Sequence, residues 1–350
     1  MTNVAKIKEP AEQAPIPFTR KDMKTENDVR WCPGCGDYAI LASIQKTMPT
    51  LGVAKEDLVF ISGIGCSSRF PYYMNTYGMH SIHGRAPTFA TGLKVSRPEL
   101  SIWMVTGDGD GFSIGGNHMI HLLRRNVDIN VLLFNNEIYG LTKGQYSPTS
   151  EVGKVAKSTP YGSVDHPVNP MAIAMGAEAS FMARVADTDA ALMTDIFQKA
   201  HEHKGTAFIE ILQNCIVFND GAFVQVSDKK QRNANQVLLE HGKPLIYDDG
   251  KKGIALNTDT MKPYIVDLEA NPEKTSDLLV HDEKDATGML CHVYAWMRHP
   301  EMPIPVGVFR ALQRPSYDEA VNAQREAIIA KEGRGTLEEL LNDGDVWDVD

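Results

Sequence analysis

The sequence predicts an α/β fold with a doubly wound, mostly parallel sheet that is covered by helices on both faces. The main observation is a succession of a buried strand over 101–106, a helix over 114–125 and a second buried strand over 129–134. Uninterrupted apolar strands are typical of sheets buried on both sides, and a helix between two of them returns the chain to a parallel neighbour. We therefore expect this stretch to form a β-α-β unit around which the rest of the chain is organised.

Polar residues follow both strands of this unit. The first strand ends at residues 107–111, which read Gly-Asp-Gly-Asp-Gly, and the second ends at Asn135 and Asn136. Ligands bind at the carboxyl ends of parallel strands, where glycines let backbone N–H groups approach a phosphate. The oxygens of Asp108 and Asn136 are suitable Mg²⁺ ligands, so a diphosphate held through magnesium is the expected occupant. An isolated Gly-Asp-Gly would indicate only a tight turn.

Composition narrows the class of protein. The chain has 350 residues, a formal net charge of −10 and no apolar run long enough to span a bilayer, which predicts a soluble, cytoplasmic protein with no membrane partner. Residues 1–28 lack the apolar segment of a secretory signal and are expected to form an extended arm. The acidic balance argues against a nucleic-acid partner, because phosphate binding usually requires a basic face.

Four of the five cysteines are expected at the same edge of the sheet. Cys32 and Cys35 form a Cys-Pro-Gly-Cys pair ahead of a helix, whereas Cys66 and Cys215 each follow a strand. Four thiolates suit either Zn²⁺ or a [4Fe–4S] cluster, and one pair with two separate cysteines is more typical of a cluster. Zinc and free buried thiols are the alternatives. Cys291 lies in an apolar stretch and is expected to be a small core residue.

Hydrophobic periodicity predicts the remaining elements. Apolar residues at helical spacing follow Asp37, and a short apolar run at 58–62 indicates a strand. Beyond the β-α-β unit, the pattern predicts a loop or lid over 151–163, a helix over 170–176, a strand over 179–185, a helix over 190–203 and a strand over 207–214.

The character of the chain changes beyond residue 228, where short, turn-rich pieces replace the apolar strands. The tail over 317–341 is expected to be a polar helix interrupted by a glycine pair. We expect three regions: an arm over 1–28, a cofactor-binding domain over 29–227, and an extension over 228–350 that packs on the body or on a partner subunit.

Five motifs follow one another in the order found in beta subunits of 2-oxoacid:ferredoxin oxidoreductases, which this sequence resembles from about residue 29 to residue 219. The motifs are Cys32-Pro33-Gly34-Cys35-Gly36, Gly63-Ile64-Gly65-Cys66-Ser67-Ser68, His83-Gly84-Arg85-Ala86, Gly107-Asp108-Gly109-Asp110 with Gly115-Gly116-Asn117-His118, and Asn136 to Gln145. The resemblance implies a thiamine-diphosphate-binding fold that carries Mg²⁺ and one [4Fe–4S] cluster.

The resemblance also implies the residues that hold these groups. The cluster ligands would be Cys32, Cys35, Cys66 and Cys215, and the Mg²⁺ ligands would be Asp108, Asn136 and the backbone carbonyl of Ile138. The cofactor-binding residues would be Ile64, Gly65, Cys66, Ser67, His83, Gly107, Asp108, Gly109, Asp110, Asn136, Ile138, Gly140, Leu141 and Thr142.

Three residues are candidates for direct roles in the reaction. His83 and Arg85 would contact substrate oxygens, and Lys143 would bind a substrate carboxylate. The alternatives are purely structural roles. His83 would then be a residue whose hydrogen bonds are made within the protein, Arg85 would link loops, and Lys143 would be a cation on the surface.

The implied activity is the reversible oxidative decarboxylation of 2-oxoglutarate with coenzyme A to succinyl-CoA, CO₂ and reduced ferredoxin. The form of residues 136–145 favours the 2-oxoglutarate or broad-specificity branch, with pyruvate as the second choice. A zinc-stabilised, non-catalytic subunit is a further alternative. In the resembled family a glutamate that activates the thiamine comes from an alpha subunit, so we expect an αβ or (αβ)₂ assembly to be required for activity.

Overall fold

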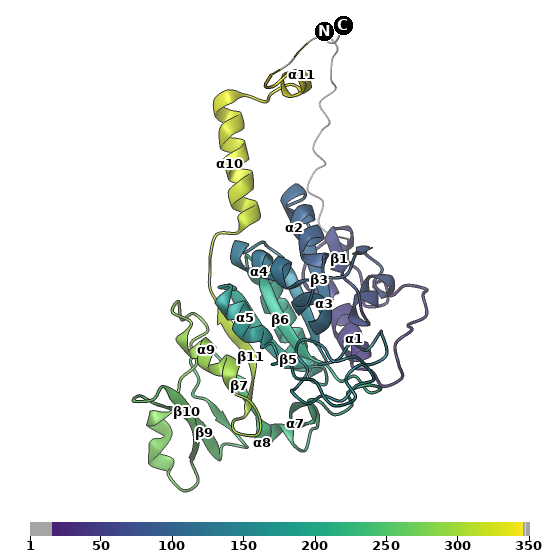
Figure 1. The fold of residues 1–350 in the computed structure, drawn as a ribbon. Coiled ribbons are helices and arrows are strands. Elements are labelled where there is room, and N and C mark those ends of the chain that lie inside the picture. The colour runs from purple at the N-terminus through teal and green to yellow at the C-terminus, as the bar shows by residue number, and fades with distance from the viewer. Residues whose placement is uncertain (1–15, 346, 348–350) are drawn as a thin grey trace.

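The computed structural model describes residues 16–345 and 347, and an eight-stranded sheet lies at its centre (Figure 1). Residues 1–15 of the expected arm lie outside the described residues. The strand order is β2-β1-β3-β4-β6-β5-β11-β7, and every pairing is parallel except that of β11 with β5. The predicted fold class is therefore confirmed. The strands are β1 (Leu58–Ser62), β2 (Tyr77–His80), β3 (Ser101–Gly107), β4 (Asn130–Asn135), β5 (Phe181–Ala186), β6 (Ala207–Leu212), β7 (Gln236–Leu239) and β11 (Ile304–Ala311).

Helices cover both faces of the sheet and enclose two hydrophobic cores. Side chains alternate along β3: Ile102 and Met104 pack in the first core, and Trp103 and Val105 in the second. The first core includes residues of α2, α4, α5 and α9, and the second includes residues of α1 and α6. The helices are α1 (Asp37–Thr47), α2 (Ala86–Ser96), α3 (Asp108–Phe112), α4 (Gly116–Arg125), α5 (Pro170–Gly176), α6 (Ala190–Glu202), α7 (Val224–Ser227), α8 (Arg232–Asn235) and α9 (Met289–Trp296).

The predicted β-α-β unit is present, with one difference at its glycine-rich connection. The expected turn over 107–111 is instead the short helix α3, and the following helix α4 begins at Gly116. Asp108 and Asp110 occupy the first turn of α3, where acidic side chains interact favourably with the helix dipole. The carboxylates are thus presented from a helical turn at the end of β3.

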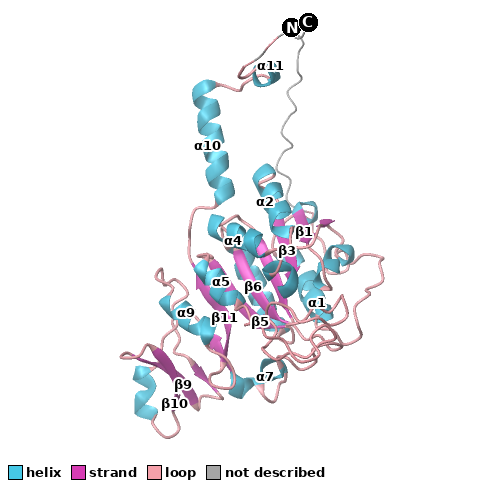
Figure 2. Cartoon of the chain, in the orientation of Figure 1, coloured by secondary structure: helices cyan, strands magenta, loops and turns pink. Residues whose placement is uncertain are grey.

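Residues beyond 228 contribute to the central sheet and also form separate structures. Strands β7 and β11 extend the eight-stranded sheet, whereas β8 (Ile246–Tyr247), β9 (Lys252–Asn257) and β10 (Lys262–Asp267) form a small antiparallel sheet. Helix α10 (Tyr317–Glu332) extends away from the body and leads to α11 (Leu337–Leu341) at its far end (Figure 2). The division of the chain at residues 28 and 227 stays a prediction.

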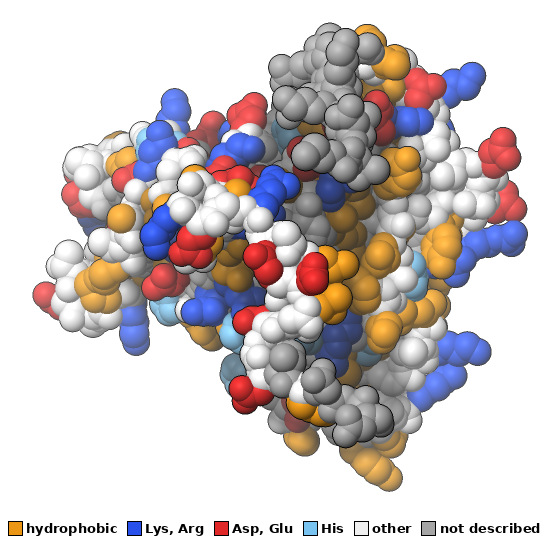
Figure 3. All heavy atoms as spheres, turned by 90° about the horizontal axis from the view of Figure 1, so that it is seen from above, with side chains coloured by type: hydrophobic (Ala, Val, Ile, Leu, Met, Phe, Trp, Pro, Cys, Tyr) orange, Lys and Arg blue, Asp and Glu red, His pale blue; other side chains and the backbone are white. Residues whose placement is uncertain are grey.

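The surface carries mixed charges. On the face seen from above, acidic and basic side chains are interspersed, and hydrophobic side chains gather between them (Figure 3). Within the described residues, no helix combines the length and the apolar character that crossing a membrane requires.

Candidate cofactor and redox site

A cavity of about 580 Å³ lies where β1, β3 and β4 end. All residues that were predicted to bind the cofactor line this single cavity, although they come from four separate stretches of sequence. Tyr139, Gln145 and Tyr146 also line it and were not predicted. A cavity of this size with few polar groups is typical of a cofactor site.

Asp110 holds together the loops that form one wall of this cavity. One carboxylate oxygen, Oδ1, accepts hydrogen bonds from the backbone N–H groups of Ile64 and Gly84 at 3.0 and 2.7 Å, and lies 2.7 Å from Nδ1 of His83. The other oxygen, Oδ2, accepts from the Thr106 hydroxyl at 2.7 Å. Because the side chain is 99% buried, these contacts fix the loops that follow β1 and β2 relative to α3.

Two loop hydroxyls hold one oxygen of the buried Asp108 carboxylate. Its Oδ2 atom accepts hydrogen bonds from the hydroxyls of Ser147 and Thr149, the latter at 2.7 Å. Burial raises the pKa of Asp108, and the two hydroxyl hydrogen bonds oppose that shift. Ser147 and Thr149 lie in the loop beyond the predicted motif, so the motif itself gave no signal for them. The donor set of Asp108, Asn136 and a backbone carbonyl fits Mg²⁺.

The side chain of Asn136 is oriented by its own hydrogen bonds. Its amide nitrogen Nδ2 donates to Oε1 of Gln213 at 2.7 Å, and its oxygen Oδ1 accepts from the backbone N–H of Ile138 at 3.2 Å. Asn136 and Ile138 both line the cofactor cavity. Gln213 was not predicted as a functional residue.

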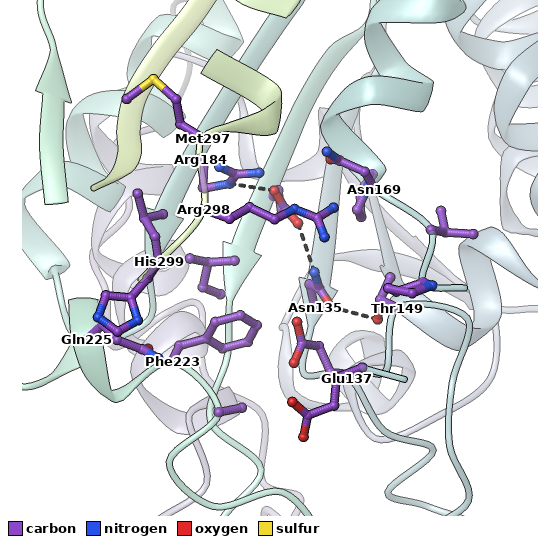
Figure 4. Close-up of a pocket in the computed structure, with 18 residues that line it drawn as sticks. Asn135, Glu137, Thr149, Asn169, Arg184, Phe223, Gln225, Met297, Arg298 and His299 are labelled. Atoms are coloured by element: carbon purple, nitrogen blue, oxygen red, sulfur yellow. Dashed lines mark hydrogen bonds and ion pairs between the residues drawn. The ribbon is translucent and has the colours of Figure 1, made fainter. Parts of the chain in front are cut away.

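A second cavity of about 200 Å³ is lined by Asn135, Glu137 and Thr149, and by Arg184 and Glu210 of the central sheet (Figure 4). A buried chain of polar contacts crosses its wall: Arg184 pairs with Glu210 at 2.7 Å, and Glu210 accepts from Asn135 at 2.8 Å. The Oδ1 atom of Asn135 lies 3.0 Å from the hydroxyl of Thr149, which also contacts Asp108. This series of polar contacts therefore connects Arg184, inside the sheet, to Asp108, the expected metal ligand.

Several carboxyl groups lie close together around the expected Mg²⁺ position. Burial, together with the neighbouring Asp108, Glu151 and Glu210 carboxylates, raises the pKa of Glu137 to about 8. Arg184 compensates only the charge of Glu210 directly. A dication bound by Asp108 would favour the ionised form of these carboxylates.

The four predicted cluster cysteines line one further cavity of about 210 Å³. Among the described residues, no three His, Cys, Asp or Glu side chains converge closely enough to hold a single metal ion. Four thiolates around one cavity suit either a zinc ion or an iron–sulfur cluster. Cys291 is buried in the first core, as its apolar surroundings predicted.

Burial raises the thiol pKa of three of these cysteines, Cys35, Cys66 and Cys215. It raises the pKa of Cys66 to about 12, and the nearby Asp37 carboxylate adds to each of the three shifts. Metal binding deprotonates such thiols because the thiolate is the ligand. Gly140 leaves open the space beside them: a Cβ atom there would lie 3.5 Å from the sulfur of Cys215 and 3.6 Å from that of Cys66.

The three candidate catalytic residues lie in different places. His83 lines the cofactor cavity and contacts Asp110. Lys143 is exposed, has a positive φ of 73° and lines the cysteine cavity. Arg85 contacts the carbonyl oxygen of Ile114 at 3.5 Å and lines neither of these two cavities. Their catalytic roles stay predictions.

Comparisons with known proteins agree with this arrangement. Residues 63–211 match the family of thiamine pyrophosphate enzymes, C-terminal TPP binding domain. The chain is 47% identical over 345 residues to the 2-oxoglutarate oxidoreductase subunit KorB of Mycobacterium tuberculosis, covering 95% of this chain and 89% of that protein. It is 45% identical over 197 residues to the beta subunit of 2-oxoacid:ferredoxin oxidoreductase 1 of Aeropyrum pernix, covering 56% of this chain and 62% of that one.

A solved structure shares nearly the whole fold. The 2-oxoglutarate:ferredoxin oxidoreductase from Magnetococcus marinus, with 2-oxoglutarate, coenzyme A and succinyl-CoA bound, aligns with a TM-score of 0.71 and 31% identity. The alignment covers 95% of this chain and 98% of that chain.

The fold, the glycine-aspartate motif and the cavity at the strand ends define a thiamine-diphosphate-binding protein. Within that class, the chain belongs to the family of 2-oxoacid:ferredoxin oxidoreductase beta subunits. The resemblance drawn from the ordered sequence motifs is thereby confirmed.

Proposed function

We propose that this chain is the catalytic beta subunit of a 2-oxoglutarate:ferredoxin oxidoreductase, in which it binds thiamine diphosphate, Mg²⁺ and one [4Fe–4S] cluster. The observation that carries this proposal is that the cofactor cavity and the cysteine cavity are neighbours. Cys66, Asn136, Gly140 and Leu141 line both of them. Such proximity suits electron transfer between the two groups.

The two groups supply complementary chemistry when bound. Thiamine diphosphate provides carbanion stabilisation and an electron sink for a 2-oxoacid, and an iron–sulfur cluster accepts single electrons. The reaction would convert 2-oxoglutarate and coenzyme A into succinyl-CoA and CO₂, with two electrons passing singly to ferredoxin. A decarboxylase that uses only thiamine diphosphate would have no use for four cysteines beside its cofactor.

The residues of this chain mainly position the reactants. Asp108, Asn136 and the Ile138 carbonyl would hold Mg²⁺ against the diphosphate, and the helical turn of α3 would present Asp108. Asp110 holds the His83 ring at the cavity wall, where its other nitrogen can hydrogen-bond to a substrate oxygen. Lys143, on the loop shared by the two cavities, is a candidate for the distal carboxylate of the substrate.

The choice of 2-oxoglutarate rests on relatives that span most of the chain. The KorB subunit of Mycobacterium tuberculosis and the Magnetococcus marinus enzyme both carry 2-oxoglutarate in their names, and both cover 95% of this chain. Coenzyme A is proposed as the acyl acceptor on the same basis. Ferredoxin is proposed as the electron acceptor because a one-electron cluster suits a one-electron carrier.

An alpha subunit is the proposed partner. The family is named for beta subunits, which implies a complementary subunit. This chain would supply the diphosphate, metal and cluster ligands, and the partner would supply the glutamate that activates the thiamine ring.

The test is substrate-dependent reduction of a one-electron dye by the anaerobically purified αβ complex. We expect turnover with 2-oxoglutarate and coenzyme A to exceed turnover with pyruvate, and neither subunit alone to be active. Asp108→Asn, which removes a negatively charged metal ligand, should abolish turnover in the complex. A beta subunit that decarboxylates 2-oxoglutarate at full rate by itself would disprove the proposal of a shared site.

A further inference from the structure

Gln213 directly follows β6 and contacts Asn136, which lines both the cofactor cavity and the cysteine cavity. Only 1% of the residue is exposed, and it lines the cysteine cavity. Its side-chain oxygen Oε1 accepts from Nδ2 of Asn136 at 2.7 Å. Its nitrogen Nε2 donates to the sulfur of Cys35 at 3.4 Å and to the carbonyl oxygen of Asn214 at 2.6 Å. One buried amide thus contacts a residue of each proposed cofactor site.

We propose that Gln213 is a positioning residue for both cofactors: its oxygen fixes the magnesium-binding orientation of Asn136, and its nitrogen donates a hydrogen bond to a cluster-ligand sulfur. This inference rests on the proposed function and deepens it. It assigns a role to a residue that none of the sequence motifs includes.

The contacts fix the orientation of both amides. The Asn214 carbonyl is an acceptor only, so the group that faces it must be the Gln213 nitrogen. The Gln213 oxygen therefore faces Asn136 and requires a donor there, which is the Asn136 nitrogen. As a result the Asn136 oxygen points away from Gln213, to the side where the backbone N–H of Ile138 reaches it. Loss of Gln213 would leave the Asn136 amide free to rotate.

The second hydrogen on the Gln213 nitrogen is available to the Cys35 sulfur. Hydrogen bonds to cluster-ligating sulfurs stabilise the more negative, reduced form of an iron–sulfur cluster and so raise its reduction potential. Burial of Gln213 excludes water that would otherwise replace this donor. Both amide hydrogens and the oxygen of the Gln213 side chain therefore have a hydrogen-bond partner.

Two substitutions separate the two roles. Gln213→Leu removes the acceptor and the donor, whereas Gln213→Glu keeps an acceptor for Asn136 and, when ionised, removes the N–H donor. The matched control is Gln45→Leu, because Gln45 is also buried but donates to the Tyr73 carbonyl on a different part of the body. All proteins are prepared as anaerobic αβ complexes and compared at about pH 8.

Two readouts are measured apart from turnover: the Mg²⁺-dependent affinity for thiamine diphosphate by calorimetry, and the midpoint potential of the cluster by titration followed with electron paramagnetic resonance. Gln213→Leu should weaken cofactor binding roughly 10- to 100-fold and lower the potential. Gln213→Glu should lower the potential while cofactor affinity stays within about twofold of the parent. Gln45→Leu should change neither.

The outcomes distinguish the possible failures. If the parent complex contains no cluster or binds no thiamine diphosphate, the proposed function itself fails. If the parent contains both and neither Gln213 variant alters the affinity or the potential, only the role of Gln213 is overturned. Equal losses of stability in the Gln213 and Gln45 variants, without a change in either readout, would likewise assign Gln213 a merely structural role.

Discussion

Asp108 and Asp110 show how much individual residues differ within one motif. Both follow a glycine at the end of β3, and the sequence pattern treats them alike. In the structure, the Asp110 carboxylate accepts hydrogen bonds from groups at Ile64, Gly84 and Thr106. The Asp108 carboxylate instead accepts hydrogen bonds from the hydroxyls of Ser147 and Thr149. The difference depends on contacts with distant loops, which spacing within the motif cannot reveal. For the same reason the contributions of Thr149 and Gln213 were not predicted.

Gly63 packs against the Asp110 carboxylate, with no room for a larger side chain. A Cβ atom on Gly63 would lie 1.9 Å from Oδ2 of Asp110, and the bonds that hold Asp110 prevent it from moving aside. Gly63→Ala should therefore displace the loop after β1 and weaken thiamine diphosphate binding by at least about tenfold, a loss that calorimetry would detect.

Gly116→Ala is the matched control for this substitution. Gly116 is in α4, and no described atom beyond its chain neighbours and the backbone of that helix lies within 4 Å of a Cβ at this position. Alanine there should leave cofactor affinity unchanged and shift stability by no more than about 1 kcal/mol. Equal cofactor affinity in Gly63→Ala and the parent protein would contradict the role given to Asp110.

At the scale of elements, the strands that are buried on both faces were predictable. The apolar runs that form β1, β3 and β4 are continuous, and that of β6 is interrupted by Glu210. The parallel order of these strands placed the functional loops at one edge. Strand β2 has only four residues and is exposed along its whole length, so it lacks the buried apolar run that marks the other strands. Strand β11 contains Pro305 and Gly307, which are unusual inside a strand and hid its place in the sheet.

A buried histidine connects β5 and α6 and gives a pH-dependent prediction. His203 lies 2.7 Å from the Ser180 hydroxyl, and burial lowers the pKa of His203 from 6.5 to about 4. Because the folded pKa is lower than the unfolded one, the unfolded chain binds more protons between these values. Stability from this group is fully present above pH 6.5 and is lost as the pH falls toward 4.

The contribution of His203 to the free energy of unfolding should fall by about 2 kcal/mol between pH 6.5 and about pH 5. Urea unfolding of the parent protein and of His203→Gln, at pH 6.5 and at about pH 5, measures this contribution. The stability difference between the two proteins should narrow at the lower pH. A difference that is constant with pH would show that His203 titrates equally in the folded and unfolded states.

At the scale of the whole molecule, the fold places two cofactor cavities at one edge of one sheet. The loops after β1 and β4 line both cavities, and residues after β6 line the cysteine cavity. Parallel strands made this edge predictable, but the contacts between the cavities could not be predicted because they depend on side-chain rotamers. The position of α10 and α11 beyond the body was likewise not predictable, since a polar helical pattern does not say what the helix packs on.

In the proposed enzyme, electrons taken from a 2-oxoacid at the thiamine diphosphate cavity reach a cluster held by Cys32, Cys35, Cys66 and Cys215. The most direct measurement is metal and sulfide analysis of the anaerobic αβ complex, followed by electron paramagnetic resonance after adding 2-oxoglutarate and coenzyme A. We expect about four irons per beta chain and a reduced-cluster signal that requires both compounds and disappears in Asp108→Asn. Zinc in place of iron would contradict the presence of this cluster. An iron cluster that stays oxidised after 2-oxoglutarate and coenzyme A are added would contradict the electron path.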